Sequence, residues 1–127
     1  MSALQEVLAL SHAGVSLKFH PPSPIVRSNI ERLLTREPTT PPWIRSFEPH
    51  EVFIDAGANI GLYSVYASVV TGARVYSFEP EAQNYAELNK NIFINGLHET
   101  VTAYCVASYR RILVMSEVRR QRLELAI

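Results

Sequence analysis

The sequence predicts an α/β protein whose core is a parallel sheet with flanking helices. Three short apolar runs, at residues 52–55, 73–78 and 101–107, have the length of buried strands and contain valine, tyrosine and phenylalanine. Segments whose apolar residues repeat at helical spacing separate these runs. Because strands alternate with helices through short loops, the strands are expected to run parallel, joined by crossover connections.

The two helices between these strands have recognisable ends. Apolar residues at helical spacing mark them: Ile60, Tyr63, Ala67 and Val70 in the first, and Ala82, Tyr85, Ala86, Leu88 and Ile92 in the second. The first helix is expected to end at Thr71–Gly72. Pro80 suits the first position of the second helix, and Asn95–Gly96 suits its end.

The residues before the first strand predict short helices separated by prolines. Residues 2–10 are expected to form a helix, and so are residues 25–36, which follow a proline-rich loop. A further short helix is expected to contain Trp43 and to run to Phe47, with a proline in its first turn.

The chain is expected to divide into three parts. Residues 1–50 form a lead-in of helices and loops, and residues 51–108 form the strand–helix–strand–helix–strand unit. Residues 109–127 form a divergent basic tail, in which we expect a strand at 112–115 and a short helix over 116–126.

The composition is that of a globular protein from a reducing compartment. Formal net charge is zero, which gives no long-range attraction to nucleic acid or to an anionic membrane. Cys105 is the only cysteine, and its apolar neighbours predict a buried, inert thiol. The four histidines lack metal-ligand spacing. No apolar run could span a membrane and no signal-peptide pattern is seen, so a cytoplasmic protein is expected.

The first predicted strand ends in an aspartate followed by a glycine loop, VFIDAGANIG at residues 52–61. In open parallel sheets, ligands bind beside the carboxyl ends of the strands. Gly57 permits a positive φ, and Gly61, expected one turn into the helix, would let that helix approach the strand. Helix N-terminal N–H groups would then face the ligand. Asn59 and Leu62 stand where a dinucleotide-binding loop needs glycine, so a pyrophosphate is not the expected ligand.

Glu79 ends the second predicted strand, 22 residues after Gly57. This is close to the spacing at which an acidic side chain accepts hydrogen bonds from ribose hydroxyls. A compact glycine loop and a ribose-binding carboxylate together favour a nucleoside without phosphates, of which S-adenosylmethionine is the common example. Asp55 could hold the cationic amino-acid end of that molecule.

At these residues the sequence resembles a known family. The segments VFIDAGANIGLYSVYAS, ARVYSFEPEAQNYAELNKNIFINGL and VTAYCVAS are similar to the FkbM family of class I S-adenosylmethionine-dependent methyltransferases. The upstream segment TREPTTPPWIRSF is also similar to the lead-in of those proteins. The resemblance implies a Rossmann-like fold, S-adenosylmethionine as cofactor, and methylation, commonly on oxygen, of a small molecule or a glycan.

The resemblance also implies roles for individual residues. Asp55, Gly57, Asn59 and Gly61 would border the methionine part of the cofactor, with Ala56 and Ala58 between them. Glu79 would bind the ribose, and Pro80 would shape its loop. No catalytic residue is assigned, because methyl transfer by displacement depends mostly on positioning.

Class I methyltransferases have a seven-stranded sheet, whereas this chain supplies only the first three strands and the basic tail. We therefore expect an N-terminal fragment of a methyltransferase, whose open sheet edge favours self-association or a complementing chain. A non-catalytic interaction module is the main alternative to an enzyme. A dinucleotide-dependent oxidoreductase is a third, disfavoured by Asn59 and Leu62.

Overall fold

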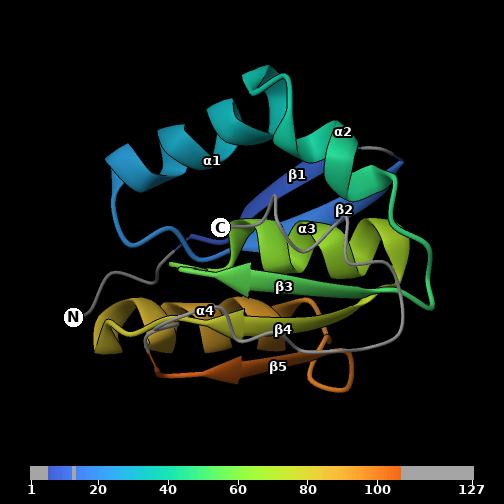
Figure 1. Cartoon of the computed structure of the whole chain (residues 1–127). Helices are drawn as coiled ribbons and strands as arrows, with labels where there is room; N and C mark the ends of the chain where they lie inside the picture. The colour runs from blue at the N-terminus through green and yellow to red at the C-terminus, as the bar shows by residue number, and fades with distance from the viewer. Residues whose placement is uncertain (1–5, 13, 107–127) are drawn as a thin grey trace.

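A computed structural model describes residues 6–12 and 14–106. Its central element is a three-stranded parallel sheet in the order β3-β4-β5, which confirms the predicted fold class (Figure 1). The strands are β3 (Val52–Ala56), β4 (Arg74–Phe78) and β5 (Val101–Tyr104), connected by the helices α3 (Leu62–Thr71) and α4 (Ala82–Ile94).

The register of the sheet places the ends of β3 and β4 side by side. Asp55 lies opposite Ser77, and Ala56 lies opposite Phe78. β3 is one of the two edge strands, so within the described residues its outer edge has no partner strand. The carboxyl ends of β3 and β4 therefore open toward the same edge of the sheet, where a ligand is expected.

Both sheet-covering helices end close to the predicted residues. Gly72 follows α3 with φ of 72° and donates its N–H to the Ser68 carbonyl. The prediction that Pro80 is the first residue of α4 is wrong, because this helix begins at Ala82 and the carboxylate of Glu81 caps it. Glu81 accepts hydrogen bonds from the N–H groups of Gln83 and Asn84, which leaves Pro80 one residue before the cap.

The prediction of a helix at residues 2–10 is wrong over residues 6–10, and residues 2–5 lie outside the described residues. Residues 6 and 7 are not helical. Residues 8–10 belong to β1 (Leu8–His12), which pairs with β2 (Val15–Phe19) as an antiparallel hairpin. Leu8, Leu17 and Phe19 are buried and alternate with exposed residues, as in a strand with one face on the core. Gly14, with φ of 78°, provides the backbone conformation that a tight hairpin turn requires.

The helices expected between the hairpin and the sheet are present. Ser23 caps α1 (Pro24–Arg36) by accepting the N–H of Val26 at 3.2 Å. The helix α2 (Thr40–Arg45) follows, with a proline in its first turn as expected. Beside β3, the ring of Trp43 lies 5.8 Å from that of Phe53, so an aromatic contact fixes α2 to the sheet.

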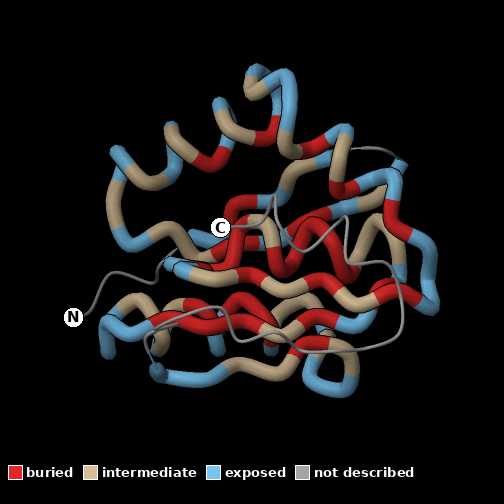
Figure 2. Tube along the Cα trace, in the orientation of Figure 1, coloured by how far each residue is buried: buried red, intermediate tan, exposed pale blue. Residues whose placement is uncertain are grey.

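One hydrophobic core joins the hairpin, α1, α2 and the parallel sheet. Figure 2 shows the buried residues concentrated on β3, β4 and α3, and β2 packs on both α3 and α4. The predicted division at residue 50 stays a prediction. The strand expected at 112–115 and the helix expected at 116–126 lie outside the described residues.

Two expectations from composition can be compared with the structure. Cys105 is exposed, so the predicted burial of its thiol is wrong. It follows the last residue of β5, and its sulfur lies 3.8 Å from the Pro80 carbonyl oxygen. No helix in the described ranges is both long and apolar enough to cross a membrane.

Candidate functional site

The glycine loop connects β3 to α3 through an unusual series of backbone conformations. Gly57, Asn59 and Gly61 have φ values of 72°, 52° and 93°. Asparagine tolerates the left-handed region better than most residues, and glycine adopts it without steric cost. The DAGANIG sequence therefore supplies the residue types that this particular loop path requires.

The N–H groups of the loop are largely satisfied within the protein. The N–H groups of Gly57 and Ala58 donate to the carbonyl oxygen of Phe78 at 2.8 and 3.0 Å. The N–H of Gly61 donates to the Ala58 carbonyl oxygen at 2.8 Å, which closes a turn. These contacts hold the loop against the end of β4 and leave these groups unavailable to a phosphate.

Glu79 organises the space beyond β4. Its side chain is only 3% exposed, and one carboxylate oxygen accepts the N–H of Asn59 at 2.8 Å. The other oxygen accepts the N–H of Glu81 at 2.9 Å. This carboxylate thus ties the glycine loop to the start of α4.

Asp55 is a buried carboxylate at the end of β3. The hydroxyl of Ser64 donates to its Oδ2 at 2.6 Å, and the hydroxyl of Ser77 lies 2.6 Å from that of Ser64. Burial raises the pKa of Asp55, hydrogen bonds from Ser64 lower it and the negative charge of Glu79 raises it, with a net result of about 6. Asp55 therefore contacts the first turn of α3 and also carries a destabilised negative charge.

A pocket of about 430 Å³ lies between α1 and the glycine loop. Five of the eight predicted cofactor-binding residues line it: Asp55, Ala56, Gly57, Ala58 and Asn59. Its other walls come from the end of the loop and from three helices. They are Ile60 of the loop, Val26, Asn29, Ile30 and Leu33 of α1, Leu62 and Tyr63 of α3, and Asn84 of α4. Gly61, Glu79 and Pro80 lie outside this lining, although Glu79 contacts Asn59 directly.

Gly61 has a different role from the one predicted. It is the N-cap of α3 and does not lie one turn inside the helix. A Cβ atom at this position would lie 2.6 Å from Cδ1 of Leu88, so Gly61 allows the loop to approach α4. Asn59 lies two residues before this cap and outside the helix.

The sequence patterns missed two groups of residues around the site. The wall contributed by α1 could not be found, because no spacing rule connects Asn29 or Ile30 to a loop 26 residues later. Asn91 is not among the predicted site residues, but it is fully buried and contacts the loop. The signal was its position, since a polar residue at i+3 from Leu88 falls on the apolar face of α4. Within residues 6–12 and 14–106, no cluster of potential metal ligands occurs.

Solved structures share this architecture. The chain superimposes on P. horikoshii TYW2, solved in complex with MeSAdo, with a TM-score of 0.54 and 21% identity, covering 82% of this chain and 37% of that one. For M. jannaschii TYW2 in complex with AdoMet, the TM-score is 0.52 with 19% identity, over 84% of this chain and 46% of the other. For a SAM dependent methyltransferase from Agrobacterium tumefaciens, the TM-score is 0.52 with 18% identity, over 84% of this chain and 34% of the other. At these identities the likeness concerns the fold.

The chain spans less than half the length of each of these three proteins. No curated protein sequence matches it. The model of the methyltransferase FkbM domain matches residues 55–125, which is more than half of the chain and begins at the buried aspartate of the glycine loop. The chain therefore belongs to the FkbM methyltransferase family.

Proposed function

We propose that this chain binds S-adenosylmethionine at the glycine loop and forms the cofactor-binding part of an O-methyltransferase. The observation that carries the proposal is the arrangement of two carboxylates at the ends of neighbouring parallel strands, beside a pocket. Asp55 ends β3 and lines the pocket, and Glu79 follows β4 and holds the loop. A volume of about 430 Å³ lies within the range of small-molecule sites.

The charge of the site fits a cationic ligand. Asp55 is buried, and the charged group that acts on it within the described residues is the carboxylate of Glu79. In this low-dielectric region the negative charge of Glu79 opposes the ionisation of Asp55. A sulfonium or ammonium group in the pocket would relieve this penalty, so Asp55 is proposed to face the positively charged end of the cofactor.

The loop does not fit a pyrophosphate. A phosphate-binding loop must present free N–H groups to the ligand. Here the N–H groups of Gly57, Ala58 and Gly61 donate to backbone carbonyls, and that of Asn59 donates to Glu79. This use of the loop amides favours a nucleoside without phosphates over a dinucleotide.

Glu79 can still bind a ribose from its present position. Each carboxylate oxygen has two acceptor sites, and the structure uses one on each oxygen. We propose that the remaining sites accept the ribose hydroxyls and that Pro80 shapes the chain as it leaves the sheet. The loop residues Ala56, Gly57, Ala58, Asn59 and Gly61 would border the methionine portion.

The cofactor would supply an electrophilic methyl group, and this chain would orient it. Positioning of the reacting atoms accounts for much of the rate in such displacements. We propose a hydroxyl of a small molecule or a glycan as methyl acceptor, in a cytoplasmic setting. Asn29 of α1, Tyr63 of α3 and Asn84 of α4 line the pocket and are polar residues that such an acceptor would meet.

A second function has one specific observation in its favour. The outer edge of β3 has no partner among the described strands, and an unpaired edge can recruit another chain. An interaction module would associate through this edge whether or not it binds the cofactor. Sedimentation at several protein concentrations, with and without S-adenosylmethionine, separates the two functions, because only the module assembles without affinity for the cofactor.

Replacement of Glu79 tests the proposed function. Glu79→Ala is expected to weaken S-adenosylmethionine binding by about tenfold to a hundredfold, the loss that follows removal of a charged hydrogen-bond acceptor. Isothermal titration calorimetry measures the change, with circular dichroism to show that the variant is folded. Glu99→Ala, at an exposed position between α4 and β5, is the control and should bind like the wild type. Unchanged affinity in folded Glu79→Ala would contradict the ribose assignment.

A further inference from the structure

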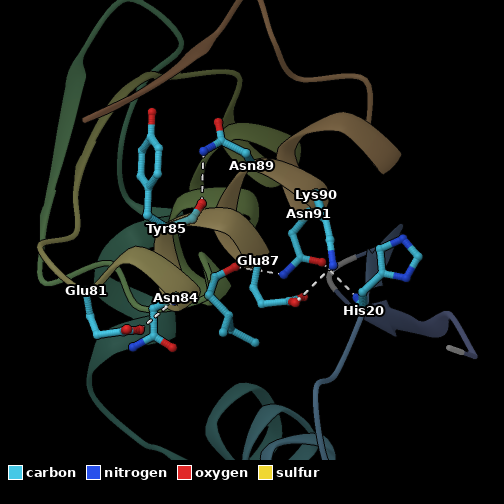
Figure 3. A network of polar contacts seen from close by, with 9 residues as sticks. His20, Glu81, Asn84, Tyr85, Glu87, Asn89, Lys90 and Asn91 are labelled. Carbon is cyan, nitrogen blue, oxygen red and sulfur yellow. Dashed lines mark hydrogen bonds and ion pairs between the residues drawn. The ribbon is translucent and has the colours of Figure 1, made fainter. Parts of the chain in front are cut away.

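Asn91 is a fully buried polar residue in the last turn of α4, and it bonds to two distant segments of backbone. Its Nδ2 donates to the carbonyl oxygen of Ile60 at 2.7 Å, and its Oδ1 accepts the N–H of His20 at 2.7 Å. Figure 3 shows the side chain of Asn91 next to the backbone of His20. A single amide therefore connects α4, the end of the hairpin and the glycine loop.

The contact with Ile60 fixes one peptide group of the loop from both ends. The carbonyl of the Ile60–Gly61 peptide accepts from Asn91, and its N–H donates to the Ala58 carbonyl at 2.8 Å. Ile60 is itself part of the pocket lining. Without Asn91 this carbonyl would be buried and unpaired, at a cost that favours a different orientation of the peptide.

Asn95, one turn further along α4, provides a natural comparison. Its side chain accepts the N–H of Lys18 at 3.0 Å and donates to the Lys18 carbonyl at 2.7 Å. It thus holds the hairpin in the same way that Asn91 does, but its side-chain hydrogen bonds go to Lys18 and to the Asn91 carbonyl rather than to the loop. A comparison of variants at the two asparagines therefore separates the attachment of the hairpin from the orientation of the loop.

We propose that Asn91 is a positioning residue that sets the glycine loop for cofactor binding and couples the N-terminal hairpin to it. The inference rests on the proposed function in so far as the loop binds S-adenosylmethionine. His20 and the hairpin precede the region that matches the family domain, and neither lines the pocket. Through Asn91, a segment without direct access to the ligand contributes to its affinity.

The informative substitution is Asn91→Asp. A carboxylate keeps an acceptor for the His20 N–H but replaces the donor with an oxygen that repels the Ile60 carbonyl. We expect the amides of Asn59 and Gly61 to exchange hydrogen about tenfold faster, and the affinity for S-adenosylmethionine to fall about tenfold, as expected for one lost hydrogen bond. Asn91→Ser, which shortens the side chain without adding charge, is the second variant and should show the same pattern.

Asn95→Ala is the matched control. It should increase exchange in β2 and leave both the loop amides and the affinity within about twofold of the wild type. Hydrogen exchange is measured by NMR and affinity by calorimetry, under conditions where each variant is folded. If Asn91 only stabilised the fold, its substitution would lower the melting temperature and leave the affinity of the folded protein unchanged.

Two results would overturn the inference. One is loop exchange and affinity in folded Asn91→Ser that match the wild type, and the other is an effect of Asn95→Ala on the loop equal to that of Asn91→Asp. The exchange measurement needs no ligand. If the wild-type protein fails to bind S-adenosylmethionine, the proposed function fails, while faster loop exchange in both Asn91 variants would still establish the positioning role.

Discussion

Gly61→Ala is expected to lower the free energy of unfolding by about 2–5 kcal/mol, the combined cost of a left-handed conformation and of overpacking. At φ of 93°, an alanine is strained whatever the surroundings. Its Cβ would also lie 2.6 Å from Cδ1 of Leu88, whose side chain is fully buried and has little room to move. Urea unfolding followed by circular dichroism measures the difference.

Gly57→Ala is the matched control for this prediction. Gly57 also has a positive φ, 72°, but a Cβ atom at this position would meet no other atom within 4 Å, so only the backbone cost of about 1–2 kcal/mol applies. Shortening Leu88 to alanine in the Gly61→Ala background should recover part of the packing loss, which a double-mutant cycle detects. Equal destabilisation by the two single substitutions would show that contact with Leu88 does not determine the choice of glycine.

Asp55→Asn is expected to have opposite effects on stability and on binding. The pKa of Asp55 is about 6 in the folded protein and 3.8 in the reference state, so its ionisation destabilises the fold by about 3 kcal/mol at neutral pH. Asparagine has the same shape and carries no charge. The variant should therefore gain stability relative to the wild type above pH 6, and it should bind S-adenosylmethionine at least about tenfold more weakly.

The pH dependence gives the sign of this effect. A carboxyl group with a raised pKa binds its proton more tightly in the folded state than in the unfolded state. The favourable contribution of the protonated Asp55 to the free energy of unfolding is therefore complete below about pH 4, and it is lost as the pH rises through about 6. The stability of Asp55→Asn minus that of the wild type should accordingly grow between these two values. Cofactor affinity of the wild type should fall below pH 6, where Asp55 is protonated; Glu79 and Tyr63 are the other titratable groups nearby. A stability difference that does not change with pH would contradict the account.

The sequence was sufficient to predict the region from β3 to β5. There, short apolar runs, helical periodicity and terminal glycines all indicate the same structure, as Gly72 does after α3. The hairpin was missed because Leu8 and Leu10 are compatible with either a helix or a strand over so few residues. Only pairing with Leu17 and Phe19, across the turn at Gly14, makes the strand the better solution.

The site shows the same division between local and distant information. Asp55, Gly57 and Glu79 could be identified because strand ends in a parallel sheet meet at one edge. The sequence could not predict that Glu79 is buried or that it bonds to Asn59 and Glu81, because these features depend on the path of the loop in three dimensions. The contribution of α1 to the pocket likewise follows from tertiary packing, which no motif spacing encodes.

The central claim is that the glycine loop and Glu79 bind S-adenosylmethionine. A titration of isotopically labelled protein with this compound, followed by amide NMR, tests the claim most directly because it reports both binding and its location. We expect saturable shifts at Gly57, Asn59, Gly61 and Glu79, with little change in the hairpin turn at Gly14. A folded protein whose spectrum does not change, or whose shifts lie away from the loop, would contradict the account.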